Sequence, residues 1–233
     1  MLTDTLKAAY WHLTLSSVAR QVRRDNLTYL SNRKIRAIER ELARIETQRI
    51  PGDAIECGVA MGGSAILIAS RLSGRRRFTG YDVFGMIPPP SERDDERSHK
   101  RYAEIAAGLS EGIGGKTYYG YENDLLAQVK QRFREFGLEP EGSSIRLVPG
   151  LFEETLTFTP GEALAFVHID CDWHDPVAYC LETCYGPLQP GGVIVLDDYN
   201  DYGGCRVATD RFLAQHPDMR MVDSSSNAVL RKG

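Results

Sequence analysis

Apolar residues in the first fifth of the chain recur at helical spacing within a charged background. The segment 33–49 carries an apolar residue at every third or fourth position, which predicts an amphipathic helix that ends at Pro51 and Gly52. A further helix is predicted over 5–20. Neither helix alternates with strands, so residues 1–50 are predicted to form a helical cap or lid. The predicted packing residues are Leu6, Tyr10, Leu13 and Leu15 in the first helix and Ile35, Ile38, Leu42 and Ile45 in the second.

From residue 51 onward, short apolar runs alternate with helical patterns. This order predicts one α/β domain over 51–233, with a mostly parallel sheet covered by helices on both faces. The predicted strands are 54–58, 78–83, 144–148, 164–169 and 193–196, with short strands within 219–231. The predicted helices are 64–72, 121–136, 176–185 and 204–215.

Three segments have the composition of irregular structure. Residues 86–101 hold three prolines followed by dense charge, which predicts a mobile surface loop that closes over a bound ligand. Residues 108–120 are rich in glycine and extend this irregular region. Residues 188–192, Leu-Gln-Pro-Gly-Gly, are predicted to form a turn.

Composition and charge exclude several classes of protein. The chain has 233 residues, 42% of them hydrophobic and 26% charged, with a net charge of −4. This balance is typical of a globular protein and argues against a duplex nucleic-acid binder, which needs a basic face. No apolar run approaches the roughly 18 residues of a membrane span, and the N-terminus lacks the features of a signal peptide.

Cysteine usage indicates a reducing compartment. The five cysteines are odd in number and form no CxxC motif, so we expect a cytoplasmic protein. Cys180 and Cys184 lie four positions apart, as two zinc ligands on one helix face would. No His/Cys pair with zinc spacing stands nearby, so half-buried helix residues are the favoured interpretation.

Ligands of such sheets bind beyond the carboxyl ends of the strands, so the residues found there are candidates for a site. The first strand ends in Glu56 and Gly58 before a glycine-rich turn, and the second ends in Asp82. The turn does not have the GxGxxG spacing of a dinucleotide site. An acid two positions before the first glycine suits a cationic ligand, and Asp82 can accept hydrogen bonds from ribose hydroxyls. Together they favour S-adenosylmethionine, with a plain tight turn and a solvated acid as the alternative.

Four carboxylates follow two strands that we expect to be neighbours. Asp170 and Asp172 end the fourth strand, and Asp197 and Asp198 end the fifth. Carboxylates this close repel one another unless a cation or protons intervene, and ligands that are all oxygen suit Mg²⁺. We therefore predict Asp170, Asp197 and Asp198 as metal ligands and Asp172 as a proton acceptor. Helix N-caps are the alternative role for one or two of these acids.

Six segments of the chain form a recognisable series: IECGVAMGGSA, DVFGMIPPP, LVPGLFEETL, HIDCDWHDP, LQPGGVIVLDDY and GGCRVATDRF. In order and spacing they resemble the macrocin O-methyltransferase (TylF-type) family, over roughly residues 50–231. The resemblance implies a Rossmann-like fold and Mg²⁺-dependent transfer of a methyl group from S-adenosylmethionine to a sugar hydroxyl of a natural product, in a homodimer or larger assembly.

The same resemblance implies residue roles. It assigns the metal ligands and the general base to the same four acids, with Asp172 as the base. The implied cofactor contacts are Glu56, Gly58 and Ser64 at the methionine end, Asp82 at the ribose, and Phe152 and Asp170.

The segment HIDCDWHD departs from the family pattern HIDGDLY, which puts the identity of the acceptor in doubt more than the chemistry. Cys171 replaces glycine, and Trp173 and His174 replace Leu-Tyr. Trp173 can pack on a sugar or anchor its loop. His174 can act as a second base, although a solvent-facing histidine is the favoured interpretation. His168 lies within a strand and is predicted to be a hydrogen-bonded core residue.

Three other functions compete with sugar methylation. A methyltransferase of catechol-type phenols would use the same metal geometry. A nicotinamide-dependent oxidoreductase is disfavoured, because clustered carboxylates would repel a pyrophosphate. A protein that uses the fold only for assembly is disfavoured by the intact set of acids.

Overall fold

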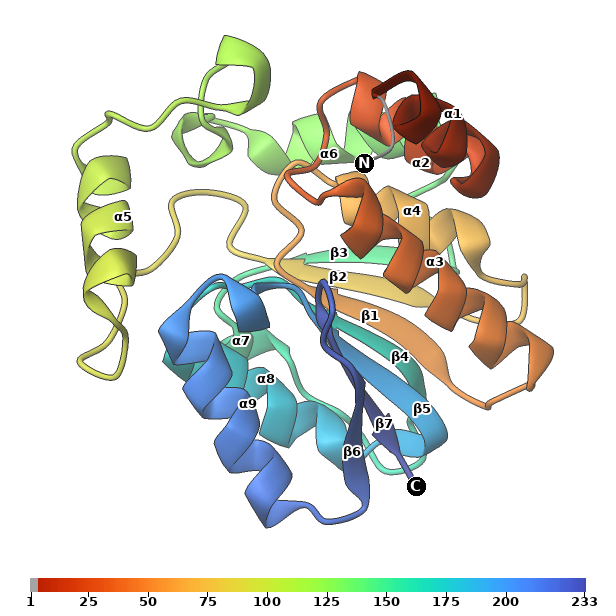
Figure 1. The fold of residues 1–233 in the computed structure, drawn as a ribbon. Helices are drawn as coiled ribbons and strands as arrows, with labels where there is room; N and C mark the ends of the chain where they lie inside the picture. The colour runs from red at the N-terminus through yellow and green to blue at the C-terminus, as the bar shows by residue number, and fades with distance from the viewer. Residues whose placement is uncertain (1–3) are drawn as a thin grey trace.

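The computed structural model describes residues 4–233, with the helical backbone alone for 4–8. A seven-stranded sheet runs through the molecule in the order β3-β2-β1-β4-β5-β7-β6 (Figure 1). The first five strands of that order pair in parallel, and β7 pairs antiparallel with β5 and β6. The strands are β1 (Asp53–Cys57), β2 (Phe78–Asp82), β3 (Ile145–Pro149), β4 (Leu164–Ile169), β5 (Leu188–Leu196), β6 (Met219–Asp223) and β7 (Ala228–Lys232).

Helices cover both faces of the sheet, as the sequence predicts. One face carries α2 (Ser17–Arg24), α3 (Asn32–Thr47), α4 (Gly63–Arg71) and α6 (Leu125–Glu135), with α1 (Asp4–Thr14) beyond them. The other carries α7 (Phe152–Thr155), α8 (His174–Tyr185) and α9 (Gly203–Gln215). None of these helices, taken over the described residues, has the length and apolar character to cross a membrane.

The predicted apolar stripe of α3 is confirmed. Ile35, Ile38, Leu42 and Ile45 are all fully buried, and Ser31 begins the helix by accepting a hydrogen bond from the Lys34 amide. These side chains lie in the same hydrophobic core as strands β1, β4 and β5. Helix α3 is therefore part of the layer that covers the sheet. The division of the chain at residues 1–50 and 51–233 stays a prediction.

The single helix predicted over 5–20 is two helices. The Ser16 hydroxyl accepts from the Ala19 amide and begins α2, while the Ser16 amide donates to Glu39 of α3. Because Ser16 makes both of these hydrogen bonds, the first helix ends before it and the second begins after it. Of the predicted packing residues, Leu15 is buried, whereas Tyr10 and Leu13 are 52% and 83% exposed. The Leu6 side chain lies outside the described part.

The predicted loop 86–101 is wrong in its second half. Helix α5 (Glu96–Ala106) begins there, because Asp95 caps it by accepting from the Ser98 amide and hydroxyl. The segment is also tied down: Pro88 accepts from the Trp173 indole, and Asp94 accepts from the His174 amide. Closure over a ligand stays a prediction.

The turn predicted at 188–192 is also wrong. These residues belong to β5, which pairs with β4 across an irregular register, and Gly191 adopts a φ of 78° there. The Arg44 guanidinium of α3 donates to the Gly191 carbonyl, which holds the irregularity against the cap. The glycine-rich segment 108–120 is irregular as predicted, with two short 3₁₀ turns at Ile113–Gly115 and Tyr119–Tyr121.

We expect the change Ile38→Ala to lower the free energy of unfolding by about 2–5 kcal/mol, because it leaves a cavity between α3 and the sheet. Chemical denaturation of the two proteins measures the difference. The matched control is Leu13→Ala in α1, an exposed position where the expected change is about 0.5 kcal/mol or less. Equal losses for the two changes would contradict burial of the cap in a common core.

Candidate active site

The predicted adjacency of the fourth and fifth strands is confirmed and brings the four acids together. Ile169 pairs with Leu196, so Asp170 and Asp197 leave neighbouring strand ends side by side. The Asp197 amide donates to the Ile169 carbonyl at 3.0 Å. Carboxylate oxygens of Asp170, Asp172 and Asp198 lie within 4.8 Å of one another, as do those of Asp197, Asp198 and Asp201.

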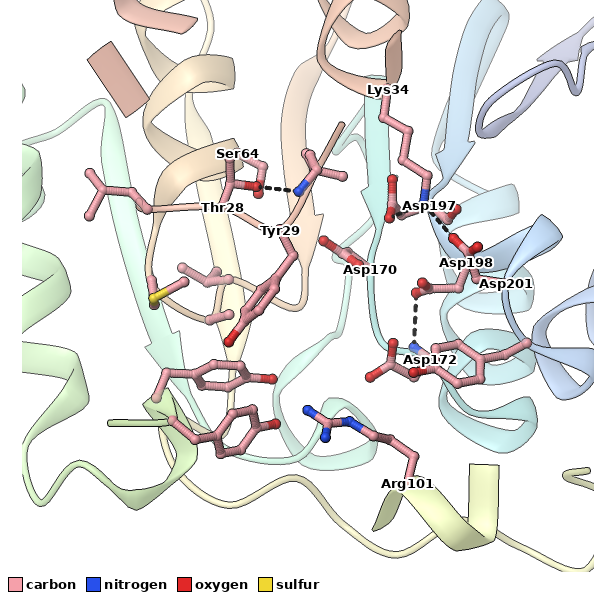
Figure 2. A pocket seen from close by; sticks show the side chains of 18 of the residues that line it. Thr28, Tyr29, Lys34, Ser64, Arg101, Asp170, Asp172, Asp197, Asp198 and Asp201 are labelled. Carbon is pink, nitrogen blue, oxygen red and sulfur yellow. Dashed lines mark hydrogen bonds and ion pairs between the residues drawn. The ribbon is translucent and has the colours of Figure 1, made fainter. Parts of the chain in front are cut away.

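These acids form one wall of a cavity of about 280 Å³, which we call the acid cavity (Figure 2). Residues from the cap, from the β1 turn and from the segment 97–119 close its other sides. Its polar lining residues include Tyr29, Lys34, Ser64, Arg97, Arg101, Tyr118, Tyr119, Asp170, Asp172, Asp197, Asp198, Asp201 and Tyr202.

Lys34 reaches from α3 into the acid cluster. Its ammonium group lies 2.7 Å from Asp197 Oδ2, 2.6 Å from Asp201 Oδ2 and 3.0 Å from the Asp197 carbonyl oxygen. Burial alone would lower the pKa of Lys34, but Asp197, Asp201 and Asp198 outweigh it and raise the pKa above its usual value. Lys34 is therefore a fixed positive charge that the cap supplies to the acids.

The negative charge that Lys34 does not balance favours the binding of protons or of a further cation by the acid cluster. Burial, reinforced by the neighbouring carboxylates, raises the pKa of Asp170 and Asp198 well above the usual range. Burial likewise raises the pKa of Asp172 to about 6. The Oδ1 atom of Asp197 is buried without a hydrogen-bond partner among the described residues. An oxygen-only set with an unpartnered oxygen fits a hard divalent cation.

Asp172 is held in an unusual backbone conformation. Its φ of 59° lies in the left-handed region, and its amide donates to Asp198 Oδ2 at 3.3 Å. Few side chains tolerate this region, but aspartate does so more readily than most. The turn directs Asp172 back toward the other acids instead of along the strand.

A second cavity of about 390 Å³ lies beside the first, beyond the ends of β1, β2 and β4. We call it the strand-end cavity. It is lined by predicted cofactor contacts, namely Gly58, Asp82, Phe152 and Asp170. The two cavities share Ala60, Tyr119, Asp170 and Asp172, so a ligand in one can meet a ligand in the other at these residues.

Two predicted cofactor contacts have structural partners of their own. Gly58 has a φ of 96°, and a Cβ there would overlap the Asp170 carbonyl oxygen, so only glycine lets β1 and β4 approach this closely. Asp82 accepts from the amides of Val59, Ala60 and Phe84 at 2.7, 2.9 and 2.6 Å. Burial raises the pKa of Asp82, while these three amides oppose the rise.

Glu56 lies behind the cavity wall. Its Oε1 is 2.7 Å from His168 Nδ1, and both side chains are fully buried. Burial raises the pKa of Glu56, and the hydrogen bond to His168 opposes the rise. Glu56 lines neither cavity, whereas Ser64 lines the acid cavity. His168 is the hydrogen-bonded core residue that the sequence predicts.

The substituted residues after Asp172 are anchors of the neighbouring loop. Trp173 is 2% exposed and donates to the Pro88 carbonyl, as a packing anchor does. The prediction of a solvent-facing His174 is wrong: it is 3% exposed, and its Nδ1 lies 2.6 Å from Asp175 Oδ1. It does not line the acid cavity. Cys180 and Cys184 are fully buried, and every metal-capable cluster among the described residues consists of aspartates.

Sequence reasoning missed several residues of the acid cavity. Asp201 carries a usable signal, since it lies in the same turn as Asp197 and Asp198. Lys34, Arg97 and Arg101 stand among many charged residues on helices, and no local pattern separates them from solvated neighbours.

Comparison with known proteins agrees with this geometry. Residues 14–230 match the family described as macrocin-O-methyltransferase (TylF). The chain belongs to this family. The match spans the cap as well as the sheet, so the family's pattern includes α2 and α3.

Two relatives of this chain are named as O-methyltransferases of natural products, and one of the names includes a rhamnosyl group. The 8-demethyl-8-(2,3-dimethoxy-alpha-L-rhamnosyl)-tetracenomycin-C 4'-O-methyltransferase of Streptomyces olivaceus is 30% identical over 76% of this chain and 60% of its own length. The mycinamicin III 3''-O-methyltransferase of Micromonospora griseorubida is 29% identical over 72% of this chain and 62% of its own length. The alignments thus span less than two thirds of either relative.

Solved structures share the fold. The O-methyltransferase NovP superposes with a TM-score of 0.73 at 20% identity, over 97% of this chain and 98% of its own. The calicheamicin methyltransferase CalS11 gives a TM-score of 0.62 at 17% identity, over 99% and 93%. The sheet is therefore the Rossmann-like sheet of the methyltransferases.

We expect Lys34→Met to lower the stability of the metal-free protein at neutral pH by about 1–3 kcal/mol, because it leaves Asp197 buried without its cation. Added Mg²⁺ should restore much of the lost stability. Thermal unfolding with and without Mg²⁺ measures both effects. The control Arg36→Met removes one positive charge from an exposed position on the same helix. Equal behaviour of the two variants would refute the role of Lys34.

Proposed function

We propose that this chain transfers a methyl group from S-adenosylmethionine to a hydroxyl of a sugar on a natural product, in a reaction that depends on Mg²⁺. The observation that carries the proposal is the junction of two cavities at Asp170 and Asp172. The strand-end cavity would hold the nucleoside part of the cofactor, near Asp82. The acid cavity would hold the acceptor, with the methionine end of the cofactor reaching it near Ser64. When bound, S-adenosylmethionine supplies an electrophilic methyl group.

The residues of the acid cavity support a division of roles. Asp170, Asp197 and Asp198 would hold Mg²⁺, and when bound the ion lowers the pKa of an acceptor hydroxyl. Asp172 would accept the proton of the hydroxyl whose oxygen gains the methyl group. The left-handed turn at Asp172 and its place in the lining of both cavities support this role. The proposed cofactor contacts that line a cavity are Gly58, Ser64, Asp82, Phe152 and Asp170. Glu56, which lines neither cavity, remains a proposed contact at the methionine end.

A sugar diol is favoured over a catechol-type phenol as the acceptor. Both chelate a divalent ion in the same way, so the acids alone do not separate them. The tetracenomycin relative, whose name specifies a rhamnosyl group, supports the sugar. Methylation of a neutral catechol but of no glycoside would reverse this assignment.

The proposal includes a homo-oligomeric assembly and a cytoplasmic location. Tyr10 and Leu13 of α1 lie exposed on the cap, which suits a homodimer or larger assembly. All five cysteines are free, which suits the reducing cytoplasm.

Asp172→Asn keeps the shape of the side chain but removes the proton acceptor. We expect turnover to fall by about 10²–10⁴-fold while the affinities for S-adenosylmethionine and Mg²⁺ stay near those of the parent protein. Methyl transfer followed by mass spectrometry, together with calorimetric titrations, gives the two readouts. The control Asp210→Asn changes an exposed acid that binds Tyr199. Near-normal turnover of Asp172→Asn would show that the proton leaves by another route.

Removal of the metal should abolish turnover, and Mg²⁺ should restore it. We expect EDTA to stop the reaction completely and Asp198→Asn to weaken Mg²⁺ binding measured by calorimetry. The sheet should remain folded, since Asp198 lies at a strand end, and circular dichroism checks this. Full turnover in EDTA would rule out the metal-dependent reaction.

A further inference from the structure

Two arginines of α5 face the acid cavity without forming an ion pair with its described carboxylates, although the charge of Arg101 opposes the rise in the pKa of Asp172. Arg97 and Arg101 lie four residues apart, which is one helical turn, and both line the cavity. Figure 2 shows the guanidinium group of Arg101 projecting from α5 into the cavity on the side of Asp172. Helix α5 stands apart from the sheet, so these side chains come from the outer wall of the site (Figure 1).

Aromatic rings hold both guanidinium groups in place. Arg97 lies 5.3 Å from the centre of the Tyr202 ring, and Arg101 lies 5.7 Å from the centre of the Tyr118 ring. Each makes few hydrogen bonds: Arg97 donates to the Asp201 carbonyl, and Arg101 donates to the Ser110 hydroxyl. A guanidinium group has five N–H donors, so most of them remain available on each side chain.

The acids of the cavity already have a cation. Among the described side chains, Lys34 pairs directly with the carboxylates of Asp197 and Asp201, whereas neither arginine forms an ion pair with a carboxylate of the cluster. Arg97 reaches only the carbonyl oxygen of Asp201. Among side chains from residue 9 onward, Arg97 has no ion pair, and Arg101 has one, 3.6 Å from the half-exposed Glu104. The arginines thus carry positive charge and free donors at the mouth of an acidic cavity.

We propose that Arg97 and Arg101 bind an anionic group, a phosphate or a carboxylate, on the acceptor itself. The inference rests on the proposed function and narrows its substrate to a sugar diol that carries a negative charge beyond the reacting ring. Paired guanidinium groups match the geometry of both anions. The acids would repel such an acceptor, so a site that accepts it needs positive charge of this kind at its outer wall.

The test compares three acceptors that share a vicinal diol: methyl rhamnoside, which is neutral, a nucleoside diphosphate rhamnose, and methyl glucuronide. In the parent protein, one charged acceptor should have a lower KM than the neutral one. A lower KM for the nucleoside diphosphate rhamnose would indicate a phosphate site, and a lower KM for methyl glucuronide would indicate a carboxylate site. Arg97→Gln and Arg101→Gln should raise the KM of the favoured charged acceptor by about 10- to 100-fold with little change for the neutral acceptor. Arg101→Lys should recover part of the loss, since it keeps the charge but not the planar fork.

Lys100→Gln is the matched control, because it removes the same charge from the same helix at a position outside the cavity. It should leave every KM unchanged. The affinity for S-adenosylhomocysteine, measured by calorimetry, should be equal in all variants. A loss of that affinity in the arginine variants would assign the arginines to the carboxylate of the cofactor and overturn the proposal. Equal KM values for charged and neutral acceptors would also overturn it.

A separate measurement keeps this test independent of catalysis. If none of the three acceptors is methylated, calorimetry with S-adenosylhomocysteine present measures their binding directly. Binding of a charged acceptor that Arg101→Gln weakens would support the anion site while the proposed function fails. Absence of any such binding would overturn the anion site itself.

Discussion

The crowding of carboxylates at the ends of β4 and β5 is the constraint on which the rest of the site depends. Parallel pairing puts Asp170 beside Asp197, and the turns that follow bring Asp172 and Asp198 into the same enclosed space. Enclosed carboxylates are costly unless positive charge or protons accompany them. The protein supplies one such charge, Lys34, from a helix far away in the sequence.

Because the carboxylates need positive charge nearby, the cap has a second role besides covering the sheet. Helix α3 buries its apolar stripe in the core of the sheet, and this packing fixes where Lys34 can reach. The outer wall makes a parallel contribution through α5, whose Arg97 and Arg101 are steadied by tyrosine rings. The cap, which precedes β1, and α5, which follows β2, thus both line a cavity whose acids follow β4 and β5.

The two cavities divide the site by polarity. The acid cavity holds the basic side chains together with the acid cluster. The strand-end cavity has several acids but, among the described residues, no basic side chain, and it is lined further by Gly58, Phe152 and the proline-rich segment that Trp173 anchors. Asp170 and Asp172 border both. The proposed transfer needs its two bound molecules to be held close together, and a junction between two cavities suits that need.

Hydrophobic periodicity in the sequence is enough to predict the parallel sheet, its flanking helices and the apolar stripe of α3, because burial produces a local pattern. The order of the strands also predicts that Asp170 and Asp197 follow neighbouring strands. The sequence did not determine the start of α5, which depends on the cap at Asp95, or the burial of His174. Only the tertiary structure brought Lys34, Arg97 and Arg101 to the acids. A charged residue on a helix looks the same in sequence whether it faces solvent or a cavity, because that difference lies in how the helix packs.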